Sequence, residues 1–261
     1  CDQGPLDALS WHMNPASPGT QCRLAKRHHL PYPDAVTEVF SFLDPIHAIP
    51  GIRAAWVERV PGLELACDRD EAMRRLRSFH QARVNEFAGS DAAWWRAEQV
   101  HGNAVAVVPG AAQIIAPDGL SAVPGVDGLL TNQAGVVLAI YVADCGAIWL
   151  ADRGTGAIGL LHSGKKGTEQ NILGVALERM AQSFGTRAED VTAVLSPCIR
   201  PPDYEIDFAA QIAAQASALG LGNFIDCGLN TAADLRRYYS YRKELGKTGR
   251  MMALIVKDPS P

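Results

Sequence analysis

Three short segments of the sequence each carry a side chain that binds metal ions, next to residues typical of turns. The segments are EQVHGN, YVADCG and LLHSGKKG, and the side chains are His101, Cys145 and His162. A borderline-soft divalent cation such as zinc accepts one thiolate and two imidazoles together, and three protein ligands leave a fourth position open. Because an open position is typical of catalytic rather than structural zinc, these residues predict a mononuclear catalytic metal site.

Each of these residues also has an ordinary structural interpretation. A cysteine in an apolar run, such as Cys145, is more often a core residue than a ligand. His101 precedes a glycine and His162 precedes Ser-Gly, which is equally typical of turn histidines. The metal site therefore depends on whether the three segments meet in the fold. If they do, metal occupancy should fall at low pH, because the ligands must be deprotonated to bind.

The segment after His162 predicts an anion site. SGKKGT opens a helix, where two glycines let the backbone approach a ligand and the first N–H groups of the helix are free. Phosphate is the expected ligand. The residues expected to contact it are Gly164, Lys165, Lys166, Gly167 and, from another segment, Arg59. The alternative is a solvated basic turn.

Size and composition indicate a globular protein that handles a small molecule. The chain has 261 residues, of which 48% are apolar and 20% charged, enough for one large core. A net charge of −4 gives no reason to expect nucleic acid as a partner. Nothing in the sequence indicates the oligomeric state.

The cellular compartment is inferred from the apolar runs and the cysteines. The sequence has no apolar run of transmembrane length and no signal peptide, so we expect a cytoplasmic protein without a membrane partner. Six cysteines, scattered without a CxxC motif, fit free thiols in a reducing compartment. The first residue is Cys1, and a lipid-modified terminus is the less favoured alternative.

The chain divides into two predicted parts. Residues 1–50 are rich in Pro, His and Ser and are expected to form an irregular leader, with a short helix near Asp34–Leu43. Residues 51–261 are expected to form a single catalytic domain. Its strands and helices do not alternate strictly, and no GxGxxG or P-loop motif is present. This favours an α+β layered fold over a doubly wound nucleotide-binding sheet.

Periodicity predicts the elements that must position the candidate ligands. Apolar residues at helical spacing, after acidic residues, predict a helix over Asp70–Ala88. Three apolar runs between Val136 and His162, separated by ADCG and RGTG, predict three neighbouring buried strands. A helix with Thr168 as its N-cap is expected next, then a helix that ends at Gly220, and a final strand in GRMMALIVK.

The order of several motifs points to a known family. The matching residues are Gln99–Gly102, Asp127–Thr131, Ala143–Cys145, His162–Gly167, Ser240–Arg242 and Gly249–Met251. With these residues the chain resembles the laccase-domain family, also called multicopper polyphenol oxidases or YfiH-like proteins. The family's pattern is QVHG, D-x-L-x-T, ADC, HAGWRG, SYRR and GRM. The resemblance extends from about Ala54 to Lys257.

This resemblance implies a layered α/β/β/α sandwich of the YfiH-like cysteine-hydrolase type, related to the catalytic domain of cytotoxic necrotizing factors. It implies zinc bound by His101, Cys145 and His162. It also implies phosphorolysis of purine nucleosides, including methylthioadenosine, to a free base and ribose 1-phosphate, and hydrolytic deamination of adenosine. Cys145, His162 and Asp144 are the expected catalytic residues, with Asp144 as a proton shuttle because it adjoins Cys145. Arg242 of the SYRR motif is an expected substrate contact.

The sequence departs from the family pattern where HAGWRG is replaced by HSGKKG. Lys166 replaces the arginine, and lysine binds phosphate as a point charge where arginine binds two oxygens at once. Lys165 replaces the tryptophan, which removes a stacking face for a purine. The family's T-R-x-G-G turn is ERVPG in this chain, so only Arg59 and Gly62 match it.

Three other functions remain open. A phenol oxidase would use copper, for which two imidazoles and a thiolate are also suitable ligands, although seven histidines are few for a multicopper cluster. A metal-free Cys145–His162 pair would act as a hydrolase. The third is a ligand-binding protein that has lost turnover, which the HSGKKG replacement favours.

Overall fold

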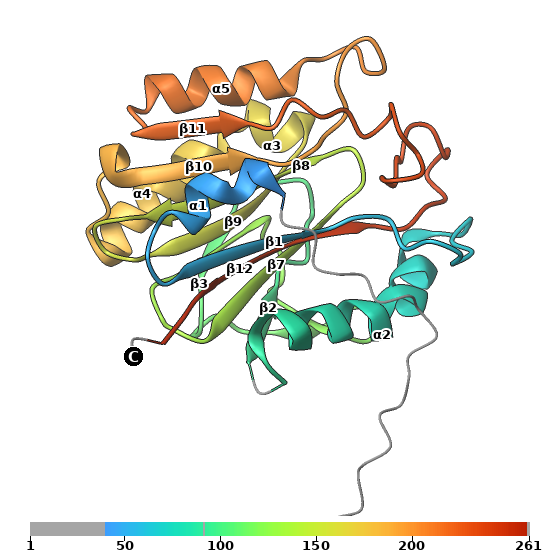
Figure 1. Ribbon diagram of the computed structural model, residues 1–261, viewed down its shortest axis with the longest axis horizontal. Helices are drawn as coiled ribbons and strands as arrows, with labels where there is room; N and C mark the ends of the chain where they lie inside the picture. The colour runs from blue at the N-terminus through green and yellow to red at the C-terminus, as the bar shows by residue number, and fades with distance from the viewer. Residues whose placement is uncertain (1–39, 91, 260–261) are drawn as a thin grey trace, which may run out of the picture. The chain divides into compact units, whose positions relative to one another are not determined.

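The computed structural model describes residues 40–90 and 92–259, which contain two large β-sheets and several helices (Figure 1). The strands of the four-stranded sheet run in the order β1, β12, β7, β2. Those of the six-stranded sheet run in the order β11, β10, β8, β9, β6, β3, and β4 and β5 form a separate hairpin. The fold is therefore mixed α+β, as the sequence predicts.

The bounds of the elements are as follows. The four-stranded sheet contains β1 (Ile52–Val57), β12 (Met251–Lys257), β7 (Val136–Val142) and β2 (Ala93–Arg96). The six-stranded sheet contains β11 (Asn223–Asp226), β10 (Val191–Leu195), β8 (Gly146–Asp152), β9 (Ile158–Ser163), β6 (Gly128–Thr131) and β3 (Val105–Val107). The hairpin contains β4 (Ile114–Ile115) and β5 (Ser121–Ala122). The helices are η1 (Ser41–Leu43), α1 (Asp44–His47), α2 (Arg69–Ala88), α3 (Lys165–Glu169), α4 (Ile172–Phe184), η2 (Ala188–Asp190) and α5 (Phe208–Ala218).

The three strands predicted between Val136 and His162 all form, but they do not all lie side by side. β8 and β9 pair antiparallel, whereas β7 pairs with β12 and β2 in the other sheet. All seven residues of β7 and of β8 are buried, so their sequences carry no alternation that would reveal the partner strands. The prediction of three neighbouring strands is wrong for β7. The chain crosses between the sheets at Ala143–Cys145, which places Cys145 at the junction.

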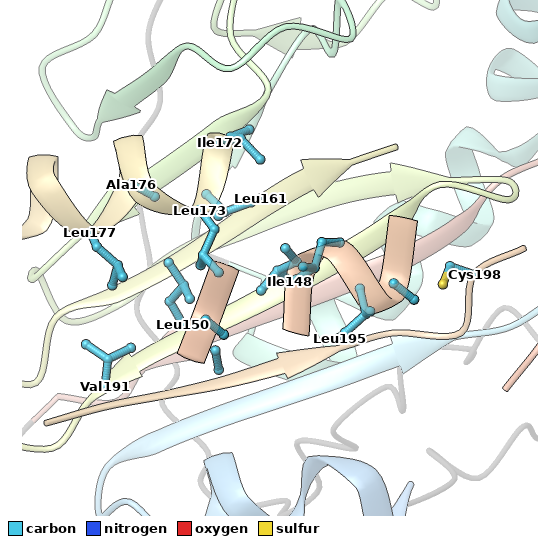
Figure 2. Packing of buried hydrophobic residues seen from close by; sticks show 14 of the residues in the cluster. Ile148, Leu150, Leu161, Ile172, Leu173, Ala176, Leu177, Val191, Leu195 and Cys198 are labelled. Carbon is cyan, nitrogen blue, oxygen red and sulfur yellow. The ribbon is translucent and has the colours of Figure 1, made fainter. Parts of the chain in front are cut away.

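Each large sheet is covered by helices on one face. Met73 and Val84 of α2 pack against residues of β7 and β12. Residues of α4 and α5 pack against β8, β9 and β10, where Figure 2 shows Leu173, Ile148 and Leu150 in one cluster. Each fully buried aliphatic side chain contributes about 1.5–3 kcal/mol of transfer free energy. Apolar burial on these faces therefore holds α2, α4 and α5 against the strands that carry the candidate ligands.

Trp149 joins the two sheets. It lies in β8 of the six-stranded sheet, and its indole Nε1 donates a hydrogen bond of 2.9 Å to the carbonyl oxygen of Leu254 in β12. Its ring centroid lies 6.0 Å from that of Trp56 in β1, in an edge-on arrangement. A buried indole needs such an acceptor, because its N–H loses water on folding. The contact fixes the distance between the two sheets at the middle of β8 and β12.

The helix boundaries agree with the sequence for α2 and differ after β9. The side chain of Asp68 accepts a hydrogen bond from the backbone of Glu71, which caps α2 as expected for an N-terminal acid. The helix expected to begin at Thr168 instead forms two helices, with α4 capped by Asn171. Asn171 has a φ of 54°, a left-handed conformation that asparagine adopts more easily than threonine. The prediction of Thr168 as N-cap is therefore wrong.

Residues 1–39 lie outside the described part of the chain, and with them most of the predicted leader and its short helix. The described end of that segment forms η1 and α1, where Leu43 and Ile46 are buried. The division of the chain at residue 50 stays a prediction. Among the described residues, every helix is too short or too polar to span a membrane.

Candidate metal centre

His101, Cys145 and His162 meet in space. Their candidate ligand atoms all lie within 4.8 Å of one another. His101 lies in the loop after β2, Cys145 in the turn between β7 and β8, and His162 near the end of β9. The two imidazole centroids are 4.9 Å apart with an edge-on angle of 78°, so the rings do not stack. His101 is exposed, Cys145 half-buried and His162 buried, so the centre is open to solvent on the His101 side.

Asp127, directly before β6, positions both histidines. Its Oδ1 lies 2.7 Å from Nδ1 of His162. The same carboxylate accepts backbone hydrogen bonds from Val100 at 3.2 Å, His101 at 2.9 Å and Gly102 at 2.7 Å. These bonds hold the His101 backbone at a φ of 63°, a conformation that is unfavourable for histidine on its own. With Nδ1 of His162 occupied, Nε2 is the nitrogen left for a ligand, as is usual behind metal-bound histidines.

The two outer glycines of HSGKKG bring the backbone close to the ligands. A Cβ atom at Gly164 would lie far inside van der Waals contact with Sγ of Cys145. At Gly167, a Cβ atom would meet the carbonyl oxygen of Gly102 at 3.2 Å and that of His162 at 3.4 Å. Both glycines are buried. Their lack of a side chain therefore allows the three ligand segments to approach one another.

The surroundings of Cys145 favour the thiolate. Burial opposes ionisation of the thiol, but the charge of His162 and hydrogen bonds from His101 and His162 outweigh it and lower the pKa to about 6. Burial also opposes protonation of His162, while the Cys145 charge and the hydrogen bond to Asp127 raise its pKa to about 9. Against the effect of burial, the hydrogen bonds from His162 and Gly102 lower the pKa of Asp127.

This donor set fits a metal ion. A thiolate and two imidazoles are the ligands that zinc and copper take in proteins, and the carboxylate behind His162 is the usual support for such an imidazole. Without a metal the same atoms form a thiolate–imidazolium pair. The geometry therefore confirms the sequence prediction that these three residues converge.

Asp144, the predicted proton shuttle, is engaged in holding two loops. Its Oδ1 accepts a hydrogen bond of 2.8 Å from the hydroxyl of Thr231, and its Oδ2 one of 2.7 Å from the backbone N–H of Arg242. Its backbone has a φ of 79°, in the left-handed region, at the turn where the chain changes sheets. Both carboxylate oxygens of Asp144 therefore have structural partners. Its catalytic role stays a prediction.

The predicted anion contacts differ in whether they already form ion pairs with carboxylates. Arg59 forms an ion pair of 2.7 Å with Glu244 and lies over the ring of Tyr239, 4.7 Å from its centroid. Arg242 is paired with Glu205 on the surface. Lys165 and Lys166 are exposed in α3, and neither forms an ion pair with a described residue. Their part in phosphate binding stays a prediction.

Sequence reasoning missed the role of Asp127. The residue was matched only as the start of the D-x-L-x-T segment, with no function given to it. One signal was present: an acidic residue between Val126 and Gly128, directly before an apolar strand, has to be buried with partners for its charge. What the sequence does not show is that those partners are the backbone of the QVHG loop and the ring of His162.

Comparison with known protein families shows which family the chain belongs to. Residues 62–215 and 205–258 match the family described as multi-copper polyphenol oxidoreductase laccase. The chain belongs to this family.

Curated relatives carry the name of an activity. "Purine nucleoside phosphorylase" of Deinococcus radiodurans is 36% identical over 155 residues, which are 49% of this chain and 60% of that protein. "Purine nucleoside phosphorylase YlmD" of Geobacillus stearothermophilus is 28% identical over 195 residues, 62% of this chain and 71% of that one. The match to the Deinococcus protein thus spans less than two thirds of that relative's length.

Solved structures share the fold. The crystal structure of YlmD from Geobacillus stearothermophilus superposes with a TM-score of 0.64 at 25% identity, covering 81% of this chain and 93% of that one. A hypothetical protein YfiH from Bacillus licheniformis superposes with the same TM-score of 0.64 at 20% identity, covering 78% of this chain and 92% of that one, a likeness of fold alone. The mixed α+β fold with its sheets is therefore that of the YlmD and YfiH structures.

Proposed function

We propose that this protein is a zinc-dependent purine nucleoside phosphorylase that also acts on methylthioadenosine and deaminates adenosine. The observation that carries the proposal is the convergence of His101, Cys145 and His162, of which His101 is exposed to solvent. Asp127 supports the imidazole of His162 from the buried side. The names of the curated relatives support the substrate class. We propose zinc over copper because three ligands with one open position are typical of zinc hydrolytic and transfer sites.

The fold that we propose is the layered α/β/β/α sandwich of the cysteine-hydrolase type. In support, α2 packs against the four-stranded sheet and α4 and α5 against the six-stranded sheet. Trp149 and Leu254 contact each other between the two sheets.

In phosphorolysis, a phosphate oxygen forms a bond to the anomeric carbon of the ribose while the bond to the purine nitrogen breaks. The protein's contribution is to hold both reactants in line and to balance their charge. Zinc, when bound, supplies a Lewis acid beside the substrate. Asp127 keeps the ligand segments in place, and the lack of side chains at Gly164 and Gly167 lets these segments approach one another. For deamination, Asp144 is the proposed residue that moves a proton near C6 of the purine.

The test combines metal analysis with a substrate panel. Protein purified without added metal should contain close to one zinc per chain. Incubated with phosphate and adenosine, inosine or methylthioadenosine, it should release the free base and the matching ribose 1-phosphate. Inosine from adenosine without phosphate would report deamination. If none of these products forms, the enzyme proposal fails, and copper together with phenol oxidation would favour the oxidase.

A second candidate is a metal-free hydrolase. It is favoured by one specific observation: Cys145, His162 and Asp127 lie in the order thiol, imidazole and carboxylate, with 2.7 Å between the last two. This is the arrangement of a cysteine nucleophile with its base and an orienting acid. Protein that remains active after zinc is removed, and is inactivated by thiol alkylation at Cys145, would support this candidate. Loss of activity with zinc, and its return when zinc is restored, would exclude it.

A further inference from the structure

Four arginines that could bind an anion fall into two groups according to their partners. Arg59 and Arg242 each hold a carboxylate, Glu244 and Glu205 respectively. Arg250 and Arg69 form no ion pair with any residue of the described ranges 40–90 and 92–259. Arg59 is also stacked on Tyr239 and donates to the carbonyl oxygen of Tyr238 at 3.1 Å, so releasing it would break several contacts at once.

Arg250 lies next to the turn that carries Cys145. It directly precedes β12, whose first residue, Met251, pairs with Val142 at the end of β7. Because the two strands are antiparallel, Arg250 comes opposite Ala143, at the start of the crossing turn. The charges of Cys145 and Asp144 act on its guanidinium.

The guanidinium of Arg250 is half-buried and held in place without being neutralised. Its Nη1 donates to the carbonyl oxygens of Thr248 at 3.0 Å and Gly249 at 2.8 Å. Both acceptors are neutral, and no described carboxylate forms a direct ion pair with the guanidinium, although the charges of Cys145 and Asp144 act on it. Two fixed hydrogen bonds on one nitrogen orient the rest of the guanidinium.

Arg69 brings a second positive charge to the same place. It is the first residue of α2, and its Nη2 donates to the carbonyl oxygen of Glu98 at 2.9 Å, in the segment that leads to His101. Burial and the nearby charge of Arg69 lower the pKa of Arg250 to about 10, which still leaves Arg250 charged at neutral pH. The two cations thus repel each other, and neither forms a direct ion pair with a described carboxylate. The charge of Arg69 also acts on Asp118.

Such a pair is unfavourable unless an anion lies between or beside the two groups. A half-buried guanidinium has lost part of its hydration, and a second cation adds repulsion. A tetrahedral oxyanion relieves both effects, because a guanidinium can bind two of its oxygens at once. The thiolate of Cys145 does not remove the need for an anion, since a bound metal ion takes up that charge.

We propose that Arg250, assisted by Arg69, binds the phosphate that reacts at this centre. The inference rests on the proposed phosphorylase function and assigns its inorganic substrate to residues outside the HSGKKG segment. It also explains how a chain that has lost the arginine of HAGWRG keeps guanidinium groups for phosphate. Lys165 and Lys166 then contribute only long-range attraction from the exposed surface of α3.

The test measures phosphate binding separately from turnover. Calorimetric titration of the zinc-loaded protein with inorganic phosphate should give an affinity that Arg250→Met lowers by about tenfold to a hundredfold, the range for losing a charge-assisted hydrogen-bonded pair. Arg250→Lys should retain part of the affinity, and Arg69→Met should lower it less. Arg74→Met, in the next turn of α2 and paired with Glu71, is the matched control and should bind phosphate like the parent.

Turnover gives the second readout. The KM for phosphate should rise in Arg250→Met while the KM for the nucleoside stays unchanged, whereas damage to the fold would move both. Folding is checked by circular dichroism and by zinc content; if Arg250→Met does not fold, Arg69→Met and Arg250→Lys carry the test. Unchanged phosphate affinity and unchanged KM for phosphate in the folded variants would overturn the inference and leave the phosphorylase function standing. Arg250-dependent phosphate binding without any ribose 1-phosphate would support the anion site and refute the proposed function.

Discussion

The thiol of Cys145 differs from those of Cys198 and Cys227 in its surroundings. Burial raises the pKa of Cys198 far above its usual range and that of Cys227 to about 11, whereas Cys145 is the thiol that histidines shift toward the thiolate. A metal ion binds the thiolate and not the thiol. Among these three cysteines, only Cys145 is therefore expected to be a ligand.

We predict that Cys145→Ala loses the bound metal and the activity together, while Cys198→Ala and Cys227→Ala keep both. The measurement is zinc per chain after gel filtration, with nucleoside phosphorolysis on the same samples. Zinc should fall from close to one per chain to nearly none in the first variant. Equal zinc content in all three variants would contradict the assignment.

Asp127 should be needed for metal affinity although it is not a ligand. In Asp127→Asn the charge behind His162 is lost and one amide oxygen must replace two carboxylate oxygens as acceptor for the QVHG backbone. Losing such a supporting carboxylate weakens metal binding by about tenfold to a hundredfold. Competition with a zinc chelator of known affinity measures the change.

The matched control for this variant is Asp152→Asn. Asp152 is also fully buried and accepts backbone hydrogen bonds, from Gly154 and Thr155, but it ends β8 at the opposite end from Cys145. Its replacement should lower stability and leave zinc affinity unchanged. A similar loss of zinc affinity in both variants would mean that Asp127 acts only through stability.

At this scale the sequence predicts the convergence of the three candidate ligands, and it does not predict which residues surround them. His101, Cys145 and His162 stand in short motifs whose residue types alone suggest metal binding. Asp127 and Arg250 stand in matched motifs too, but their roles depend on which groups lie around them, and no spacing rule supplies that. Arg59 is expected to contact phosphate and Arg242 of the SYRR motif to contact the substrate; the structure shows each paired with a glutamate, and both roles stay predictions.

At the scale of elements, the contact between the β9–α3 turn and the β7–β8 turn sets the distance between His162 and Cys145. The two residues that meet there are Gly164 and Cys145. Gly164 has a φ of −107°, which alanine adopts without strain, so the side chain itself is what the site excludes. The added methyl group would occupy the space of the Cys145 sulfur.

We therefore predict that Gly164→Ala lowers zinc affinity by about tenfold or more without removing a ligand, because a sub-ångström displacement of one ligand is enough to spoil the coordination geometry. Zinc content and chelator competition provide the measurement. Gly185→Ala is the control: its φ of 73° makes alanine strained by about 1 kcal/mol, yet it lies at the end of α4 with open space around it. Equal zinc affinity in the two variants would show that the Gly164 contact is not needed.

The elements were predicted better than their partners. Periodicity located α2, α5 and the strands β7, β8, β9 and β12, since each presents a long apolar run or face. It did not show that β7 leaves the sheet of β8, because strands buried on both faces look alike in sequence. The start of α4 was misplaced for a similar reason, since Thr168 and Asn171 both have the side chain of a cap and backbone geometry decides between them.

On the scale of the described residues, the candidate metal centre lies where the chain crosses between the two sheets, and buried polar groups lie between β7 and α2. Arg96 of β2 and Asp118 form a buried ion pair of 2.6 Å. His80 of α2 is 1% exposed, and its ring lies 5.1 Å from that of Tyr141 in β7. Burial of such groups makes the stability of the molecule depend on pH, since each must keep one protonation state in the folded form.

His80 gives this dependence a sign. Burial, with repulsion from Arg96, lowers its pKa to about 3 in the folded protein, from 6.5 in an unfolded chain. Between these values the unfolded chain takes up a proton that the folded protein does not, so the free energy of unfolding falls as the pH falls from 6.5 toward 3. A single proton contributes a slope of about 1.4 kcal/mol per pH unit within this window. Carboxylates with lowered pKa values, such as Asp118, add to the acid loss at lower pH.

We predict that His80→Phe, which keeps an aromatic ring beside Tyr141, takes up about one proton fewer on unfolding between pH 6 and 4. The slope of its unfolding free energy against pH is then smaller by about 1.4 kcal/mol per pH unit. Urea unfolding at several pH values measures it for the variant and the parent. The difference between the two free energies at about pH 8.5 isolates the effect of repacking, because His80 is then almost entirely neutral in both states. The change of that difference with pH isolates the proton. Because Asp118 and the other carboxylates are present in both proteins, their contributions cancel in the comparison. Parallel curves for the two proteins would mean that His80 is protonated as easily inside the fold as outside it, and that the buried side of α2 admits water.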